Sequence, residues 1–491
     1  MKFFSNHKVA IFFVMAFVIR LISLNQSLWL DEATTAIAVQ THSFWNIVTQ
    51  FSPSDFHPPL YYLFMKIWTG IFGYSEVALR VPSVLFSLGA GWFVYKIGKI
   101  ISGSRIGVRD DKNVGFWSAS FFLLNPLIIY YSQEARMYSM ATFFIAASFY
   151  YFVKYLRSNA KRLTSNFWIM NIFFILSFYT FYASSFYIAA VWIYLLMSKR
   201  YKLIMFSVVS FILPLLLISP LLYLQLLNSR VALEQVTNWA SILGNVSVKN
   251  LALIPIKFTS GRISFEPKMI YYMLAGGWMI ALFGMIGMSS IAAINKVRML
   301  LFFLTIPLLL GLFFSFFSPL LQYFRFQYLI VFLSMLLALG MGSIPFFSTA
   351  SPRGAQAIVS KKVSSPMVVN VIGMLVLMVF ISWSLLYLLN PQFHREDWKS
   401  LAQELHKEEA SVYMILSSSD SLKYYAPEVE VQDLRSLTNQ EKKILIIPYT
   451  SDIHGVDYQT VLQETHILRR TQSFRQLTYE YWQVLEPAEN L

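Results

Sequence analysis

Two adjacent carboxylates, Asp31 and Glu32, are the side chains of this sequence best placed to do chemistry. They lie in the run 28–33, just beyond the first hydrophobic segment of a chain that otherwise has few charges. Ionisable groups close to a bilayer are rare and usually mark a functional site. A carboxylate there can serve as a general base, or the acidic pair can simply favour the positive end of a helix that begins at this point.

The composition predicts a protein that crosses a membrane several times. Of 491 residues, 56% are hydrophobic and only 13% are charged, proportions that an ordinary soluble domain does not have. The formal net charge is +14, but Lys and Arg occur in short clusters between apolar runs, which argues against a nucleic-acid partner. The absence of cysteine excludes a thiol nucleophile and a thiolate metal site.

About eleven apolar segments approach the roughly 20 residues that a spanning helix needs. They cover residues 9–24, 77–101, 114–131, 138–157, 166–182, 184–198, 203–224, 269–292, 299–318, 327–347 and 367–389. Lys and Arg gather in alternate loops, so the positive-inside rule places the N-terminus and the basic loops in the cytoplasm. The odd number of spans then places the acidic pair and residues 391–491 outside the cytoplasm.

The elements that must position the acidic pair belong to a long first outer loop, residues 25–76. Its segments 33–51 and 60–68 mix apolar and polar residues in a way that suits helices lying in the membrane interface, the second starting after Pro58-Pro59. Residues 130–138 and the long loop 225–268 are expected on the same side. Together, residues 1–390 are predicted to form an α-helical polytopic membrane core.

Residues 391–491 are polar and mixed, which predicts a small soluble α/β domain outside the cytoplasm. Strand-like runs occur at 412–416, 444–447 and 479–485, with helical patterns near 395–408 and 457–467. Because none of the strands is followed by a Gly-rich phosphate loop, no nucleotide site is expected in this domain.

Several motifs, in their order along the chain, resemble those of a known family. They are Asp31-Glu32 in the first outer loop, His57-Pro58-Pro59-Leu60-Tyr61-Tyr62, Glu76 with Leu79-Arg80-Val81-Pro82-Ser83, and Ser132-Gln133-Glu134-Ala135-Arg136-Met137-Tyr138. This order resembles the C-type membrane glycosyltransferases (GT-C), closest to the protein O-mannosyltransferase and aminoarabinose-transferase branch, glycosyltransferase family 39. Residues 322–329 are similar to the family's Arg-Tyr-Leu-like element.

The resemblance implies a GT-C fold and the transfer of one sugar from a polyprenyl-phosphate donor to an acceptor at the outer face of the membrane, with inversion. Asp31 would then be the general base, and Glu32 would orient it or exchange roles with it. The expected ligands of the donor phosphate are Arg136, Arg325 and Lys66. Arginine is favoured over lysine because its planar group can bind two phosphate oxygens.

The remaining polar side chains of these motifs are expected to form a shell around substrate or metal: His57, Glu134 and Tyr138. In relatives, acidic and histidine side chains of these loops bind a divalent metal, and Asp31, His57 and Glu134 could supply such ligands. The sequence has no dedicated metal spacing, so a metal is optional. His57 stands where an aminoarabinose transferase is expected to carry lysine, which leaves the sugar open.

Structural alternatives exist for several of these residues. His57 could only fix a turn, Arg80 could form an i,i+4 ion pair with Glu76, and Arg136 could extend toward lipid headgroups.

The rival class of protein is a transporter or flippase of lipid-linked sugars. Transporters place ionisable groups near the middle of the bilayer, whereas these spans lack carboxylates at mid-depth. We therefore expect an enzyme of a bacterial cell inner (plasma) membrane, whose partners are the lipid-linked donor, membrane lipids and a glycan, lipid or protein acceptor.

Overall fold

The computed structural model describes residues 2–103, 114–158, 164–236, 238, 244–288, 294–341, 366–406, 408 and 410–485. The predicted linker 348–365 and several basic residues used to orient the chain lie outside the described residues. The chain forms two compact units. The first comprises residues 1–22, 81–217 and 245–390, and the second comprises residues 23–80, 218–244 and 391–491.

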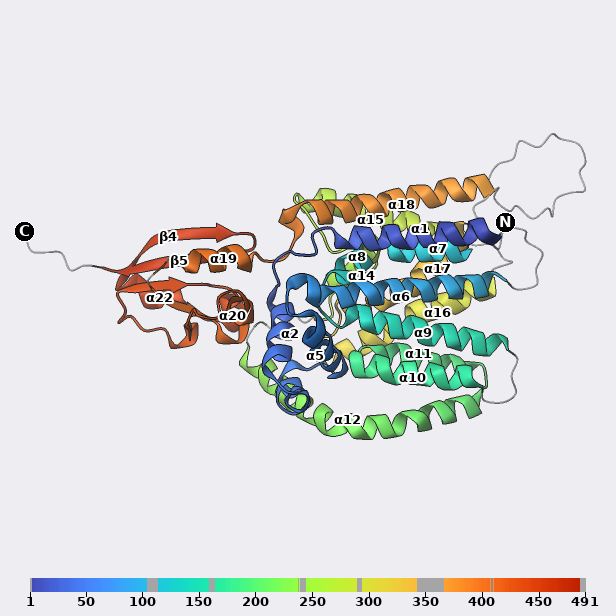
Figure 1. Ribbon diagram of the computed structural model, residues 1–491, viewed down its shortest axis with the longest axis horizontal. Coiled ribbons are helices and arrows are strands. Elements are labelled where there is room, and N and C mark those ends of the chain that lie inside the picture. The colour runs from blue at the N-terminus through green and yellow to red at the C-terminus, as the bar shows by residue number, and fades with distance from the viewer. Residues whose placement is uncertain are drawn as a thin grey trace, which may run out of the picture. The chain divides into compact units, whose positions relative to one another are not determined.

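The first unit is a bundle of helices whose axes run in broadly the same direction (Figure 1). Its helices are α1 (Lys2–Leu21), α7 (Val114–Leu123), α8 (Pro126–Ser132), α9 (Tyr138–Arg157), α10 (Ser165–Thr180), α11 (Ser184–Met197), α14 (Val248–Ser260), α15 (Lys268–Gly287), α16 (Ile294–Ser315), the 3-10 helix η3 (Tyr323–Leu329), α17 (Ile330–Met341) and α18 (Pro366–Leu389). The unit boundaries fall within two further helices, α6 (Glu76–Ser102) and α12 (Tyr201–Gln235). Helix α17 is buried along its whole length, which suits a continuous apolar run at the centre of a bundle.

Six described helices are long and apolar enough to cross a membrane, which marks the chain as a membrane protein. They lie within α6, α12, α15, α16, η3 with α17, and α18; the bent pair α7 and α8 would make a seventh. The expected count of about eleven is therefore not confirmed. Part of the difference is length, because α10 has 16 residues and α11 has 14.

Two segments differ from their predicted form. Residues 114–131, expected as one span, are two helices bent by 57°, because Asn125 caps α8 through bonds from the amides of Leu127 and Ile128, and Pro126 follows it. The predicted loop 225–268 is also largely helical: α12 continues to Gln235 and α14 spans Val248–Ser260.

In the second unit, the predicted helix 33–51 is a series of short pieces. They are α2 (Leu30–Thr41), α3 (Phe44–Asn46), the π-helical turn η1 (Ile47–Phe51) and α4 (Ser52–Asp55). The break has a local cause, because the Ser43 hydroxyl accepts a bond from the amide of Asn46 and starts a new helix. The helix predicted after the proline pair is confirmed as α5 (Leu60–Phe72).

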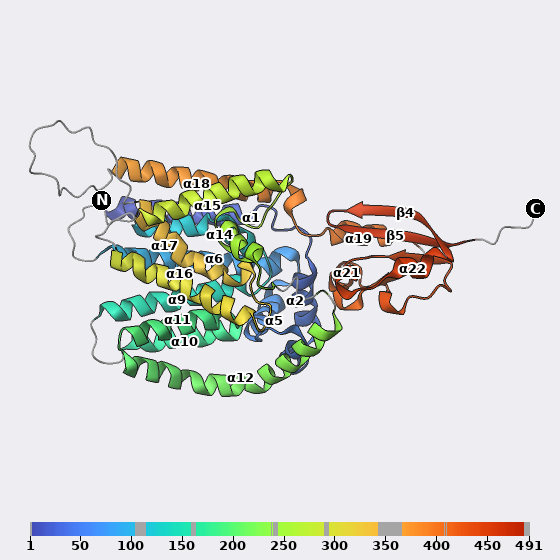
Figure 2. The same ribbon diagram turned by 180° about the vertical axis from the view of Figure 1, so that it is seen from behind.

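Residues 391–485 contain a five-stranded mixed sheet, seen from both sides in Figure 1 and Figure 2. Its strands are β1 (Ser411–Met414), β2 (Val431–Asp433), β3 (Lys443–Ile446), β4 (His466–Phe474) and β5 (Leu477–Val484), in the order β2-β1-β3-β5-β4. β1 pairs in parallel with β2 and β3, whereas β5 is antiparallel to β3 and β4. The runs predicted at 412–416, 444–447 and 479–485 are strands, but β2 and β4 were missed, and β4 replaces the end of the helix predicted at 457–467.

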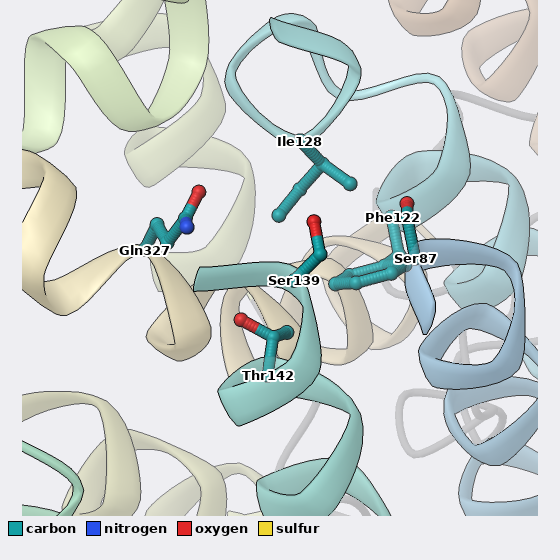
Figure 3. A pocket seen from close by; sticks show the side chains of 6 residues that line it. All are labelled: Ser87, Phe122, Ile128, Ser139, Thr142 and Gln327. Carbon is teal, nitrogen blue, oxygen red and sulfur yellow. The ribbon is translucent and has the colours of Figure 1, made fainter. Parts of the chain in front are cut away.

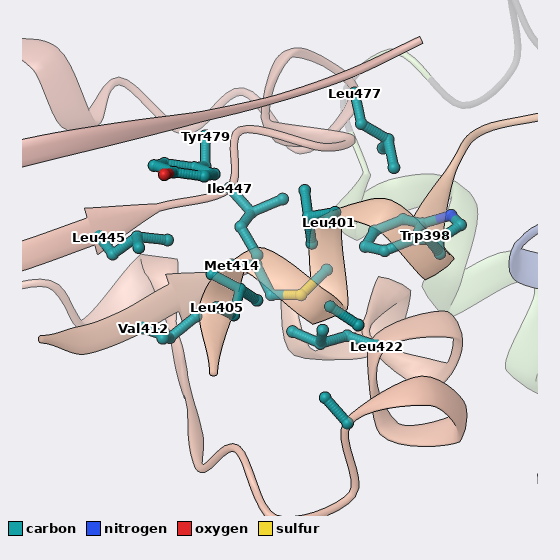
Figure 4. Close-up of a cluster of buried hydrophobic side chains, with 12 residues drawn as sticks. Trp398, Leu401, Leu405, Val412, Met414, Leu422, Leu445, Ile447, Leu477 and Tyr479 are labelled. Atoms are coloured by element: carbon teal, nitrogen blue, oxygen red, sulfur yellow. The ribbon is translucent and has the colours of Figure 1, made fainter. Parts of the chain in front are cut away.

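Alternation along these strands gives the sheet two buried faces. Val412 and Met414 face a core with α19 (Trp398–Leu405) and α20 (Asp420–Tyr425), which Figure 4 shows. Tyr413 and Ile415 face the opposite core with α22 (Tyr458–Gln463). Three short helical segments, η4 (Pro391–Phe393), η5 (Leu416–Ser418) and η6 (Leu434–Ser436), and helix α21 (Ser451–His454) complete the chain. The α/β character predicted for this region is thus present.

Candidate active site

The two adjacent carboxylates sit in the first turn of α2 but differ sharply in environment. Glu32 is fully buried, whereas Asp31 is half-buried. The residue that caps α2 is Trp29, whose side chain makes no capping bond. Asp31 and Glu32 can therefore favour the helix dipole, but neither occupies the capping position.

Glu32 is bound on both oxygens by one arginine. Arg80 donates from Nε to Oε1 at 2.8 Å and from Nη2 to Oε2 at 2.6 Å. The same guanidinium donates to the backbone carbonyls of Leu24, Gln26 and Ser27 at 2.9, 2.6 and 3.1 Å. Arg80 thus neutralises the charge of Glu32 and donates a hydrogen bond to each of its carboxylate oxygens.

The suggested i,i+4 pair between Arg80 and Glu76 is wrong. Glu76 instead pairs with Lys399, with 2.6 Å between Oε1 and Nζ. The physical reason is burial. Arg80 is 1% exposed and Glu32 is 0% exposed, so either charge would be costly if unpaired, whereas Glu76 is partly exposed and is solvated by water.

His57 lies in a hydrogen-bonded cluster of the same unit. Its Nδ1 is 2.9 Å from a carboxylate oxygen of Asp55, and that oxygen also accepts a 2.6 Å bond from the Tyr62 hydroxyl. Gln225 of α12 donates to the carbonyls of Ser52 and His57 at 2.8 and 2.9 Å. The cluster fixes the turn before the proline pair, as the structural alternative for His57 expects.

Lys66 is the third predicted phosphate ligand and has a structural contact. Its ammonium donates to the carbonyl of Val39, in the last turn of α2, at 2.7 Å. A cation at the C-terminal end of a helix is favoured by the helix dipole.

In the first unit, the motif 132–138 is buried and bonded to its surroundings. Gln133 donates to the carbonyls of Arg20 and Ile22 at 2.9 and 2.7 Å, and Ser83 donates to the carbonyl of Glu134 at 2.6 Å. Arg136 is only 3% exposed, which does not fit the alternative of a side chain extended toward headgroups. Glu134 is buried as well.

Tyr138 and Arg325 are brought together by aromatic contacts. Tyr138 packs edge-on against Tyr131 and Phe324, with ring centres 5.3 and 5.7 Å apart. The guanidinium of Arg325 lies 5.7 Å from the Phe324 ring and donates to the carbonyl of Pro319 at 2.9 Å. This cluster therefore unites two of the residues predicted from sequence.

A second arginine, which was not predicted, adjoins the same cluster. Arg262 lies 5.0 Å from the Tyr130 ring and bonds its hydroxyl, and Tyr130 packs edge-on against Tyr131. Its position in the predicted outer loop 225–268 was the available signal, but no motif surrounds it. Nearby in the chain, Lys257 is buried and bonds two carbonyls and the Tyr271 hydroxyl; burial lowers its pKa to about 7.

A small polar cavity adjoins this region of the helical unit. It has a volume of about 10 Å³ and is lined by Ser87, Phe122, Ile128, Ser139, Thr142 and Gln327. Figure 3 shows Ser139, Thr142 and Gln327 around it. Both polar atoms of the buried Gln327 amide lack a hydrogen-bond partner among the described residues. A cavity of this size is at the lower limit for holding one water molecule.

The predicted site residues thus fall into two sets. Asp31, Glu32, His57 and Lys66 belong to the second unit, and Glu134, Arg136, Tyr138 and Arg325 belong to the first. Within the described part of the chain, no three His, Asp or Glu side chains are grouped so that they could hold a metal ion.

A comparison with known families matches the part of the chain that contains the motifs at 57–62, 76–83 and 132–138. Residues 56–224 match a family model described as dolichyl-phosphate-mannose-protein mannosyltransferase. Among proteins with curated descriptions, none matches this sequence.

Solved structures share the fold at low sequence identity. ArnT from Cupriavidus metallidurans in the apo state aligns with a TM-score of 0.57 and 12% identity, over 97% of this chain and 98% of that chain. The same protein bound to undecaprenyl phosphate aligns with a TM-score of 0.55, 12% identity and the same coverage, 97% and 98%.

An archaeal relative of the fold also aligns. The oligosaccharyltransferase AglB from Archaeoglobus fulgidus, in complex with an inhibitory peptide and a dolichol-phosphate, has a TM-score of 0.51 and 12% identity, over 94% of this chain and 73% of that chain. The resemblance read from the motifs is confirmed: this chain has the fold of the C-type membrane glycosyltransferases and carries the protein mannosyltransferase pattern over residues 56–224.

Proposed function

We propose that this chain is a membrane glycosyltransferase that moves a single sugar from a polyprenyl-phosphate donor to an acceptor hydroxyl or amine. The observation that carries the proposal is the family match over residues 56–224, joined to the acidic turn by the buried pair between Arg80, inside that match, and Glu32. The pair fixes the first turn of α2, and Arg80 binds Glu32, which is one of the two adjacent carboxylates. Asp31, half-buried and next to it in the chain, is then the carboxylate assigned to chemistry.

Asp31 is assigned as the general base of an inverting single displacement. It accepts the proton of the acceptor hydroxyl or amine while the acceptor atom attacks the anomeric carbon. The bond between that carbon and the phosphate oxygen breaks, and polyprenyl phosphate leaves with the electron pair. Glu32 acts by holding Asp31 in place, because its two oxygens are occupied by Arg80.

The leaving phosphate gains charge, and a fixed guanidinium in a low-dielectric site stabilises that charge. Arg325 and Arg136 are assigned to this role, and Arg262 joins them because it adjoins the same aromatic cluster as Arg325. Lys66 is a weaker candidate, since its ammonium already bonds the end of α2. The solved structures of ArnT bound to undecaprenyl phosphate and of AglB in complex with a dolichol-phosphate support a polyprenyl-phosphate donor.

His57, Glu134 and Tyr138 are proposed to contact substrate around these groups. The proposal also places the N-terminus in the cytoplasm and residues 391–491, with the acceptor, on the outer face of a bacterial inner membrane. Its support is the distribution of Lys and Arg among the predicted loops.

The test is release of undecaprenyl phosphate from synthetic undecaprenyl-phosphate monosaccharides by purified protein, with and without a chelator. Asp31→Asn should lower turnover by about 10²- to 10⁴-fold, because an amide cannot accept the proton. The matched control is Asp452→Asn, which removes an exposed carboxylate of the same unit and should leave turnover unchanged. Equal turnover of wild type and Asp31→Asn would refute the assignment of the base. Transport of labelled donor across liposomes without any release would instead indicate a flippase.

A further inference from the structure

The segment that carries Asp31 is held by residues of the C-terminal α/β domain. Five contacts join segment 25–34 to this domain, all within the second unit. From α19, the Lys399 ammonium donates to the carbonyl of Asn25 at 3.2 Å and the Trp398 amide donates to the Ser27 hydroxyl at 3.0 Å. At α20, the Tyr425 hydroxyl accepts a bond from the Leu28 amide at 2.8 Å, and Asp420 accepts a bond from the Thr34 hydroxyl at 2.8 Å. The Arg395 guanidinium lies 3.6 Å from the centre of the Trp29 ring.

Four of the five contacts come from residues of helices α19 and α20. Trp398 begins α19 and is fully buried in the core on one face of the sheet. Asp420 and Tyr425 are the first and last residues of α20, which packs in the same core. Side chains on well-packed elements hold a site more precisely than side chains on loops. The conformation of segment 25–34 is therefore coupled to the folding of residues 391–485.

A tyrosine of the domain packs against Trp398, the residue that bonds Ser27, and also bonds a glutamate. The Tyr449 hydroxyl donates to Oε1 of Glu396 at 3.5 Å, and the Tyr449 ring packs edge-on against Trp398, 5.0 Å between centres. Burial raises the pKa of Tyr449 well above its usual value, and the charges of Glu396 and Asp31 raise it further. Tyr449 thus keeps its proton at neutral pH and remains a hydrogen-bond donor to Glu396.

We propose that Glu396 and Tyr449, acting through Trp398 and segment 25–34, are positioning residues for Asp31, so that the C-terminal domain completes the active site for an acceptor hydroxyl or amine. This inference rests on the transferase function proposed above. It assigns the domain a part in the reaction itself, because the domain fixes where Asp31 stands when the acceptor arrives. Small displacements of a catalytic group reduce the rate without abolishing donor binding.

The first experiment compares two Tyr–Glu pairs on opposite faces of the same sheet. Tyr449→Phe and Glu396→Gln alter the pair beside Trp398. The matched controls are Tyr458→Phe and Glu480→Gln, which alter the pair joined by a 3.2 Å bond on the other face. The substrate is the undecaprenyl-phosphate sugar that wild type turns over, and the readouts are kcat, KM for the donor and the thermal midpoint.

The variants of the pair beside Trp398 should lower kcat by about 10- to 100-fold while KM for the donor stays within about twofold. The controls should match wild type in kcat, even if they lower the thermal midpoint as much. Equal kcat for both sets of variants would overturn the inference. So would a fall in kcat that merely follows the fall in thermal midpoint in both sets.

The second experiment uses the absence of cysteine from the sequence. Thr34→Cys with Asp420→Cys introduces two thiols where the hydroxyl and carboxylate now bond. A short bifunctional methanethiosulfonate reagent then joins segment 25–34 to α20, and a reductant releases it. Single-cysteine variants treated in the same way are the controls.

The linked protein should retain most of the turnover of the reduced protein, because the contact belongs to the working arrangement. Loss of turnover on linking that the reductant restores would show that the domain must leave segment 25–34, which overturns the inference. Failure of the reagent to link two reactive thiols would overturn it as well. An inactive wild type would refute the proposed function, whereas an active wild type with unaffected Tyr449 and Glu396 variants would refute only this inference.

Discussion

Two fully buried arginines, one in each unit, are held in different ways. In the second unit, Arg80 binds both oxygens of Glu32 and three backbone carbonyls. In the helical unit, Arg20 donates to the carbonyls of Ala16 and Leu123 at 2.9 and 2.8 Å and to the Ser87 hydroxyl at 3.2–3.3 Å. No carboxylate among the described residues pairs with Arg20.

The difference separates two uses of a buried cation. Arg20 joins α1 to α6 and to the residues before α8 through dipoles, so its removal leaves only neutral acceptors behind. Arg80 neutralises a buried charge in the turn that carries Asp31, so its removal leaves a carboxylate without compensation. The loop with the proposed base therefore depends on charge pairing, and the helical unit depends on backbone acceptors.

The largest effect is expected for Arg80→Met. Leaving the buried Glu32 unpaired should cost about 3–5 kcal/mol of stability and lower the thermal midpoint in detergent by many degrees. Replacing both partners, as Glu32→Leu with Arg80→Met, should recover much of this loss. If Arg80→Met is no less stable than the double variant, Arg80 does not stabilise the buried charge of Glu32.

Arg20→Met should have a smaller effect, about 1–3 kcal/mol, because it leaves neutral carbonyls and a hydroxyl unsatisfied. Turnover per folded molecule should change less than for Arg80→Met, since Arg20 does not bond the acidic turn. Thermal unfolding and donor turnover measured on both variants compare the two arginines directly. A larger loss for Arg20→Met than for Arg80→Met would reverse the comparison.

Two buried glutamines, one in each unit, allow a second comparison of stability. Gln225 in the second unit bonds two carbonyls, so Gln225→Met should cost about 1–3 kcal/mol. The amide of Gln327 in the helical unit has no hydrogen-bond partner among the described residues, so Gln327→Met should be nearly neutral or stabilising. A marked loss of stability for Gln327→Met would indicate that ordered water in the cavity bonds this amide. The measurement is the thermal midpoint of each variant relative to wild type.

The smallest effect is expected from an ionisable group near the surface. Burial lowers the pKa of His454, and the charge of Arg435 lowers it further. A histidine with a lowered folded pKa contributes stability above its unfolded pKa of about 6.5, and this contribution is lost as the pH falls below that value. The thermal midpoint of wild type should fall slightly more than that of His454→Gln between pH 7 and pH 5. Parallel curves would show that His454 does not contribute.

Several features of the fold could be predicted because they depend on local sequence. The apolar runs, the proline pair before α5 and the alternating strands of the C-terminal domain all follow from composition and spacing. Helix α2 was also expected, but its end at Thr41 was not, because a single serine hydroxyl starts the next helix. Strand β4 was missed, since most of its residues are exposed and it lacks a clean alternation.

The sequence by itself determined the membrane class, the GT-C resemblance and the choice of Asp31, Glu32 and the 132–138 motif, because apolar length and short motifs are local properties. Only the tertiary structure decided how the charges are paired: Glu32 with Arg80, Glu76 with Lys399, and Trp29 against Arg395. These partners lie 48 to more than 300 positions apart in the chain. Such pairing depends on which side chains the fold buries together, and a buried charge selects its partner by proximity in space.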